Sequence, residues 1–416
     1  MIPISQFIKT DKQKNNMSKK IIIISTIVLV IFFISLAGYY FLIQTNENAS
    51  NGETFSFRRF LPFGGETIIP EPTEIDPNIP IEEPQINFAV KLRKIWSEPV
   101  AGAFVYDTQE GSIVRLVERS TGHVYDVDLF SPNNKRISNT TIPKVYDAKW
   151  INKDSFVAQF LEDDNETIRT YIIEVNEPLG TTTEGTSLGK IINENINSLS
   201  VSQNRFFYLA LTGSIGEGFI GNQTNTSIRK VWSSPIKELN LQDLGGNNVA
   251  LFTKPYPNVN GFLYLVNTTN GVFRRVLANI PGLTVLVSPN TSKVLTLSQS
   301  NSNRFYIYNV SNVEEIDINP ITFPEKCIWS NEEDSFFCAV PKNQLQPSSL
   351  ISWYLGNVSF EDSIWKYNSE TGFGSSVDSL DKEGIDVIKP ILNPSERYLI
   401  FTNKKDGSLW SLDLQN

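Results

Sequence analysis

The chain has few of the residues from which catalytic and metal sites are usually built. Its 416 residues include one histidine, two cysteines and two methionines. A zinc site made of histidine and cysteine needs three or four such ligands close together, so we expect no metal centre of this kind. His123 is the only imidazole available for acid–base chemistry, and we interpret it as a turn residue without a catalytic partner.

Motifs of common enzyme classes are also missing. The sequence has no G-x-S-x-G elbow, no phosphate-binding P-loop and no D-x-D-x-D-G calcium loop. Acidic clusters at 163–166 and 332–334 could in principle supply paired carboxylates, but such runs are typical of solvated hairpin tips. The net charge of −9 disfavours binding to nucleic acid. We therefore predict no catalytic residue set, no cofactor and no nucleic-acid partner.

Residues 21–43, IIIISTIVLVIFFISLAGYYFLI, contain no charged side chain. As a helix they would span about 34 Å, enough to cross a hydrocarbon core of about 30 Å. The alternative is a cleaved signal peptide, which has a shorter apolar core and a small-residue cleavage site. The following QTNENAS offers no good site, so an uncleaved transmembrane helix is our interpretation.

Five lysines precede this segment against one acidic residue, Asp11. By the positive-inside rule, residues 1–20 form a cytoplasmic basic tail and everything after residue 43 lies outside the membrane. Residues 44–87 show no amphipathic period and are rich in proline and glutamate. Proline and like charges favour an extended chain, so we interpret this segment as an extracytoplasmic linker. The predicted location is the cell membrane, as a single-pass protein.

From residue 88 to the end, short β-branched and aromatic runs alternate with Gly, Pro, Asn and Asp. KLRKIWSEPVAGAF at 91–104 is repeated as TSIRKVWSSPIKEL at 226–239. The pattern predicts four-stranded units of roughly 47 residues, a length typical of β-propeller blades. Seven blades fit best, while six or eight remain open because 341–384 could conceal another strand. The predicted inner strands lie near 100–106, 145–150, 196–202, 238–244, 282–288, 324–329 and 386–391.

The last unit lacks an outer strand, because the chain ends soon after GSLWSLDL. At the other end, FAVKLRKIW (88–96) has the pattern of an outer strand with no blade before it. We expect this first strand to complete the last blade, which would close the ring and leave no free sheet edge.

A tight turn of Asn, Asp, Pro and Ser joins two apolar strands in several units. The best copy, NPSERYLIFTNKKDGSLWSLD at 393–413, resembles the WD40-like repeat of TolB-type propellers. The chain departs from that repeat at the Asp-Gly of the turn, which becomes SER, NTS or EED in the blades that carry the element. The resemblance implies an all-β propeller and carries no catalytic residue, so it implies binding at most. The whole chain is also similar to uncharacterised membrane-anchored bacterial propellers.

Cys327 and Cys338 flank one of these turns, in EKCIWSNEEDSFFCAV. A turn centred between residues 332 and 333 places the two cysteines directly opposite each other, close enough for a disulfide. Such a bond is expected outside the cytoplasm. Two buried thiols are the alternative.

The longest predicted loop, 341–361, carries Trp353, Tyr354 and Leu355, and a second loop, KPYPNVNG at 254–261, carries Tyr256. We interpret these four residues as candidate contacts for a protein or glycan partner. The alternative for the longer loop is that its aromatic side chains fold back over the blade. The leading functional hypothesis is a binding or scaffold module of the cell envelope. The alternatives are a carbohydrate-active hydrolase or lyase with paired carboxylates, and a lectin-like glycan binder.

Overall fold

The computed structural model describes residues 91–415 except 132, 163–166, 178–184, 193–195, 203, 225–226 and 381–382. The predicted segments 1–20, 21–43 and 44–87 lie outside the described residues. Within the described part of the chain, no helix has the length and apolar character needed to cross a bilayer.

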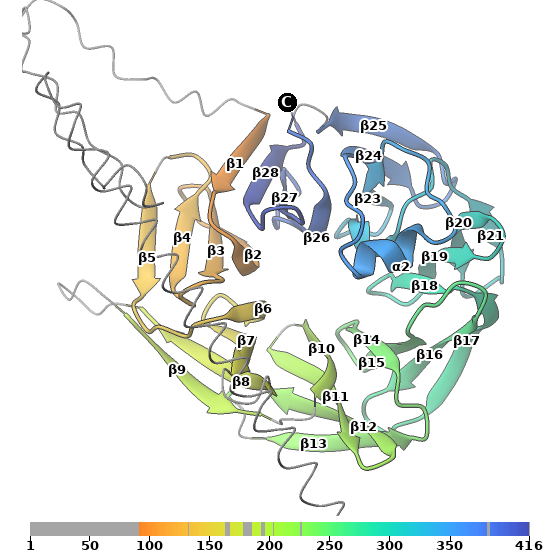
Figure 1. Ribbon diagram of the computed structural model, residues 1–416, viewed down its shortest axis with the longest axis horizontal. Helices are drawn as coiled ribbons and strands as arrows, with labels where there is room; N and C mark the ends of the chain where they lie inside the picture. Colours follow the sequence, from red (N-terminus) through yellow and green to blue (C-terminus); the bar gives the residue numbers. More distant parts are fainter. Residues whose placement is uncertain are drawn as a thin grey trace, which may run out of the picture. The chain divides into compact units, whose positions relative to one another are not determined.

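The described residues form seven four-stranded antiparallel sheets, arranged as blades around a central axis (Figure 1). The inner strands are β2 (Val100–Asp107), β6 (Val145–Asn152), β10 (Ile196–Ser202), β14 (Leu239–Asp243), β18 (Thr284–Val287), β22 (Cys327–Trp329) and β26 (Val387–Leu392). The second strands are β3 (Ser112–Glu118), β7 (Ser155–Glu162), β11 (Arg205–Thr212), β15 (Asn248–Thr253), β19 (Lys293–Gln299), β23 (Ser335–Pro341) and β27 (Tyr398–Asn403).

The third strands are β4 (Val124–Asp128), β8 (Thr167–Asn176), β12 (Ile215–Asn222), β16 (Asn260–Asn267), β20 (Asn303–Asn309), β24 (Asp362–Asn368) and β28 (Leu409–Asp413). The outer strands are β5 (Asn134–Ser138), β9 (Thr186–Ile191), β13 (Ile228–Ser234), β17 (Phe273–Pro281), β21 (Glu315–Asp317), β25 (Gly374–Ser379) and β1 (Leu92–Trp96). The predicted seven blades and the positions of their inner strands are confirmed.

The ring closes as the sequence predicted. β1, the first strand of the propeller, pairs antiparallel with β28, the last, with Leu92 opposite Leu412 and Lys94 opposite Trp410. Blade seven is therefore built from both ends of the propeller domain. The pairing covers the edge of β28, so the two ends act as a clasp. The expectation that closure leaves no free sheet edge is wrong, because β1 is itself the outer edge of blade seven, as the outer strand is in every other blade.

Apolar side chains fill the spaces between blades rather than a single central core. Seven buried clusters occur, and each is shared by two neighbouring sheets. The second strands face a neighbour on both sides, which explains why β27, YLIFTN, is buried throughout and lacks an apolar–polar alternation. The cluster between blades seven and one includes Ile95 of β1 and Leu116 of β3. The clasp is thus packed like the other interfaces.

The two faces of the ring differ in the connections that they carry. On the hairpin face, the first strand of each blade turns into the second, as at 288–292, 330–334 and 393–397. On the crossover face, the second strand turns into the third and each outer strand connects to the next blade, as at 119–123 and 404–408.

Side-chain hydrogen bonds join neighbouring blades at all seven interfaces near the hairpin face. The bonded pairs are Arg115 with the Lys153 carbonyl oxygen, Asn152 with Asn204, Arg205 with Asp243, Gln242 with Val287, Asn290 with Glu333, Asn331 with Glu396, and Asn393 with Asp107.

The turns in which other residues replace Asp-Gly keep the backbone conformation of the glycine. Thr291, Glu333 and Glu396 occupy the glycine position and keep its left-handed backbone, with φ of 66°, 57° and 54°. The carboxylates of Glu333 and Glu396 each accept a hydrogen bond from a backbone N–H of the preceding blade's turn. At these two positions a glutamate takes a left-handed backbone, which glycine adopts more easily, and gains a hydrogen bond between blades.

Candidate functional site

The crossover face is the less regular of the two faces. Its longest described loop joins β23 to β24 and contains α2 (Ser349–Tyr354), while η3 (Pro324–Lys326) leads into β22. Figure 1 shows α2 close to the central axis, beside the inner part of blade six. We call residues 342–361 the blade-six insert.

The four residues predicted to contact a partner all lie in loops of the crossover face, but they differ in exposure. Tyr256, Tyr354 and Leu355 are 62%, 43% and 69% exposed, whereas Trp353 is 4% exposed. The interpretation of Trp353 as a partner contact is wrong, and the alternative, an aromatic side chain that folds back over the blade, is confirmed for this residue. Its indole N–H donates to the Asp386 carboxylate at 3.0 Å, so the ring anchors the insert instead of presenting it.

A buried ionic cluster holds the insert in place. The Lys326 ammonium lies 2.6 Å from Asp362 and 2.5 Å from Asp386, and all three side chains are 0% exposed. Asp386 also accepts the backbone N–H of Phe360 at 3.0 Å, besides the indole of Trp353. Burial raises the pKa of Asp362, although the charge of Lys326 opposes that shift. One carboxylate thus ties both α2 and the end of the insert to the start of blade seven.

A second contact joins α2 to η3. The Tyr354 hydroxyl donates a hydrogen bond to Glu325. Burial raises the pKa of Glu325, against the hydrogen bond from Tyr354 and the charge of Lys326. Burial, and then the negative charge of Glu325, raise the pKa of Tyr354 well above its ordinary value. The Tyr354 hydroxyl is therefore engaged, and only part of its ring is free for a partner.

A cavity of about 490 Å³ opens beside the insert, where blades one, two and seven meet. We call it the mouth cavity. Its walls carry four cationic side chains and two carboxylates: Arg119, Lys389, Lys404 and Lys405 against Asp147 and Asp406. This excess of positive charge stands out in a chain whose net charge is −9.

Lys389 has an unusual backbone at the edge of this cavity. It has φ of 52° although it precedes Pro390, a position that favours extended backbone. Proline cannot donate to the sheet ladder, and the pairing of β26 with β27 shifts between Ile388 and Ile391. Left-handed backbone at a bulky residue beside a cavity is the kind of strain that collects at functional sites.

The Lys389 side chain reaches from blade seven past blade one to blade two. Its ammonium donates to the Ala101 carbonyl oxygen at 2.8 Å and to the Asp147 carboxylate at 2.5 Å. Burial lowers the pKa of Lys389, and the charge of Asp147 opposes that shift. Burial alone would raise the pKa of Asp147, but Lys149 and Lys389 together lower it. Asp147 is consequently held as an anion.

A second cavity of about 310 Å³ lies along the inner strands and shares Lys389 and Thr402 with the mouth cavity. Most of its other lining side chains are apolar: Phe104, Trp150, Val201, Ile391 and Leu409 are among them. We call it the channel cavity. Lys149 and Ser200 also line it, so a ligand that entered from the crossover face would pass mainly charged groups first and mainly apolar walls next.

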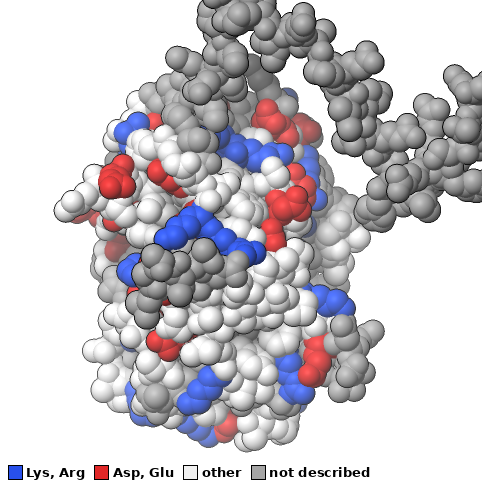
Figure 2. Space-filling view, turned by 90° about the vertical axis from the view of Figure 1, so that its left-hand side faces the viewer, with Lys and Arg blue, Asp and Glu red and all other residues white. Residues whose placement is uncertain are grey.

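Three of the cations at the mouth have no carboxylate partner among the described residues. Arg119 donates to the Tyr146 carbonyl oxygen at 3.3 Å, and the Lys404 ammonium lies 5.4 Å from the centre of the Trp353 ring. No ion pair involves Lys405 within the described chain. By contrast, Figure 2 shows positive and negative side chains interspersed on the side of the ring that it faces.

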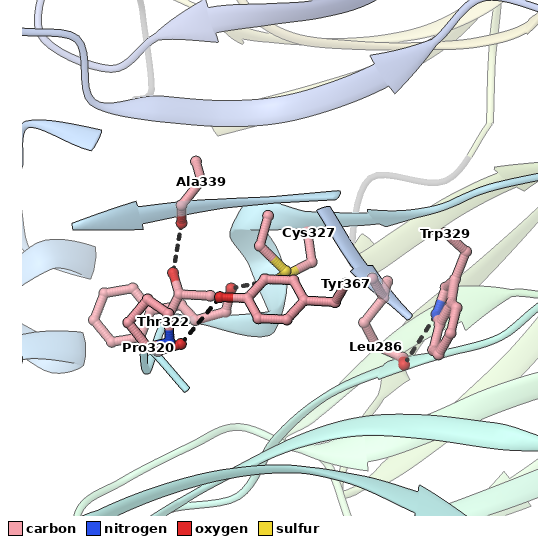
Figure 3. Close-up of a disulfide and its surroundings, with 9 residues drawn as sticks. Leu286, Pro320, Thr322, Cys327, Trp329, Ala339 and Tyr367 are labelled. Carbon is pink, nitrogen blue, oxygen red and sulfur yellow. Dashed lines mark hydrogen bonds between the residues drawn. A yellow bond between two sulfur atoms is a disulfide. The ribbon is translucent and has the colours of Figure 1, made fainter. Parts of the chain in front are cut away.

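The two cysteines lie in blade six, away from the mouth cavity. Cys327 and Cys338 are joined as a disulfide and pair directly across β22 and β23. Figure 3 shows the bond among contacts that fix this blade: Tyr367 donates to the Pro320 carbonyl oxygen at 3.2 Å, and Trp329 donates to Leu286 of blade five at 3.4 Å. The position of the disulfide within the blade indicates a structural role.

His123 and the acidic clusters form no catalytic arrangement in the described part of the chain. The His123 ring lies 3.2 Å from the Thr141 hydroxyl. Glu333 of the cluster at 332–334 accepts a hydrogen bond from the turn of the preceding blade, and the cluster at 163–166 lies outside the described residues.

The sequence interpretation overlooked the mouth cavity. Arg119, Lys389 and Lys404 come from separate parts of the chain, and nothing in their local sequence marks them as neighbours. The one available signal was Lys389–Pro390 inside a predicted inner strand, because proline in such a strand indicates a break in the ladder.

No protein-family model matches the chain, and no curated protein matches it in sequence. Many solved structures do match its fold. The tricorn protease shares 9% identity at a TM-score of 0.50 over 78% of this chain, which spans about a third (34%) of the protease. TolB from Acinetobacter baumannii shares 10% identity at a TM-score of 0.41, over 68% of this chain and 64% of TolB.

Oligogalacturonate lyase from Vibrio parahaemolyticus shares 10% identity at a TM-score of 0.45, over 78% of this chain and 91% of the lyase. Similarity at such low identity shows the fold alone. The chain is a seven-bladed β-propeller whose structural neighbours include TolB and propellers of several enzymes.

Proposed function

We propose that this protein is a membrane-anchored, extracytoplasmic propeller that binds a partner on its crossover face without catalysing a reaction. The observation that carries the proposal is the gathering, on that face, of the mouth cavity and the exposed Tyr256 and Leu355. Exposed apolar side chains and cavities that share a face are both typical of binding surfaces.

The uncharged run at 21–43 and the lysines before it support the anchor and its orientation. The disulfide between Cys327 and Cys338 supports an oxidising compartment. The location is tested by adding proteinase K to intact cells, with a C-terminal epitope as the readout. Loss of the epitope without lysis supports an extracytoplasmic propeller, and protection until lysis contradicts it.

A carbohydrate-active enzyme with paired carboxylates is the alternative, and the mouth cavity gives it little support. A general acid needs a carboxyl whose pKa is raised. Asp147 and Asp406, the two carboxylates of the mouth cavity, both have a lowered pKa. For Asp406, burial is outweighed by the hydrogen bonds from Ser408. Glu325 and Asp362, whose pKa is raised, are tied up in the contacts that hold the blade-six insert.

The binding proposal is tested by site-specific photocrosslinking in living cells. A photoreactive amino acid is placed at Leu355 on the crossover face or, as a matched control, at Val313 on the hairpin face, since the two are 69% and 68% exposed. We expect a discrete crosslinked species from position 355 that position 313 does not give. Identical products from both positions, or release of sugar from a glycan by the purified protein, would contradict the proposal.

A further inference from the structure

The mouth cavity has the charge of an anion-binding site. Arg119, Lys404 and Lys405 lack carboxylate partners among the described residues, as shown above. The two carboxylates in the cavity wall are already engaged. Asp147 lies 2.5 Å from Lys389 and 3.4 Å from Lys149. Asp406 accepts the Ser408 hydroxyl at 2.6 Å. An entering anion would therefore meet uncompensated positive charge.

The arrangement of the cavities restricts the kind of anion. The mouth cavity continues, through the shared Lys389 and Thr402, into the channel cavity with Phe104, Trp150 and Leu409 on its walls. An inorganic anion would use only the first of these environments. A glycan would place hydroxyl groups against the apolar walls, where they would lose hydrogen bonds to water. An acidic peptide that ends in apolar residues complements both environments.

We propose that the mouth cavity binds an acidic peptide segment of the partner, with its carboxylates on Arg119 and Lys405 and an apolar residue of the same segment in the channel cavity. This inference rests on the proposed function and names the chemistry of the contact. Charge-assisted hydrogen bonds to guanidinium and ammonium groups supply the attraction. Lys389 has a left-handed backbone and lies at the junction of the two cavities. Its position determines where the charged part of the bound peptide ends and the apolar part begins.

The test uses the full-length protein in a mild detergent and a synthetic peptide of four glutamates followed by two leucines. Its binding is measured by isothermal titration calorimetry beside that of the analogue with glutamine for each glutamate. We expect the glutamate peptide to bind about tenfold or more tightly than the analogue. Its affinity should fall as sodium chloride rises from about 0.05 to 0.5 M, because salt screens the attraction.

Two charge-reversed variants localise the site. Arg119→Glu with Lys405→Glu changes two exposed cations of the mouth cavity, and Arg274→Glu with Arg275→Glu changes two exposed cations on the outer strand β17. Both change the net charge equally. We expect the first variant to weaken binding of the glutamate peptide about tenfold or more and the second to leave it within about twofold. Matching melting temperatures would show that both variants are folded.

Three results would overturn the inference: equal binding of the glutamine analogue, unchanged binding by the Arg119/Lys405 variant, or tighter binding of a galacturonic acid tetramer than of the glutamate peptide. The proposed function fails on different grounds, because it depends on the crosslink from position 355. A crosslink from that position together with any of these three results would leave a binding propeller whose partner does not use an acidic peptide.

Discussion

The two faces of the ring differ in how regularly their contacts recur from blade to blade. Near the hairpin face, a side-chain hydrogen bond joins neighbouring blades at every interface. On the crossover face the notable features occur once. Among the described residues, the insert and the buried Lys326 belong to blade six, and the Lys389 side chain reaches from blade seven past blade one to Asp147 of blade two.

The difference separates features that hold the ring from features that need another explanation. A joint repeated in every blade is what a closed ring requires, since each interface must be stable. A buried ion pair and a left-handed lysine before proline are costly, and the fold does not require them in the other blades. Both features lie on the crossover face, and Lys389 also lines the mouth cavity, which is why we place binding on this face.

The largest expected effect comes from removing the clasp on which both faces depend. Deleting residues 88–97 removes β1, exposes the edge of β28 and takes Ile95 out of the interface between blades seven and one. We expect the variant to lose cooperative thermal unfolding, as followed by circular dichroism. Deleting residues 44–84 in the linker is the control and should leave the melting curve unchanged. A normal melting curve for the 88–97 deletion would show that the ring does not need the clasp.

The next largest effect tests the anchor of the blade-six insert. Lys326→Met leaves Asp362 and Asp386 buried without their counter-charge, which typically costs about 3–5 kcal/mol. Lys254→Met is the control, because Lys254 pairs with Glu238 at the surface, where such pairs contribute about 1 kcal/mol or less. Urea unfolding measures both. An equal loss in the free energy of unfolding in the two variants would mean that the buried cluster is not what holds the crossover face together.

The features common to all blades were accessible from the sequence. The repeated turns located the inner strands, and the chain-end argument located the clasp, because both depend on local patterns of apolar and turn residues. The site was not accessible in the same way. For Trp353 the sequence left a surface position and a folded-back position both open, because its partner, Asp386, lies in another loop. Pro390 signals a break in the ladder, but not that the preceding side chain reaches Asp147 of blade two.

A smaller effect tests the contact between Lys389 and Asp147 by its pH dependence. Asp147→Asn is expected to cost about 1–2 kcal/mol at pH 7, because it removes a charge-assisted contact with Lys389. The pKa of Asp147 in the folded protein is below its ordinary value of 3.8, so its stabilising effect is complete above that value. It is lost as the pH falls through the lower, folded value.

The gap in stability between wild type and Asp147→Asn should therefore be constant from pH 7 to about pH 5 and should narrow below about pH 4. Urea unfolding across that range measures it, with Glu238→Gln at the surface as the control. A gap that widens towards acid pH would have the wrong sign and would exclude a lowered pKa for Asp147.

The smallest effect concerns the left-handed turns of the hairpin face. Thr291→Gly should stabilise the protein by about 0.5–1 kcal/mol, because glycine adopts a φ of 66° without the penalty of a β-branched side chain. Glu396→Gly relieves the same kind of backbone strain but loses the hydrogen bond from Asn331 of the preceding blade. That loss of about 1 kcal/mol should cancel the gain. If both variants raised the melting temperature equally, the hydrogen bond of Glu396 would not hold neighbouring blades together. The regularity of the hairpin face would then depend on the apolar interfaces alone.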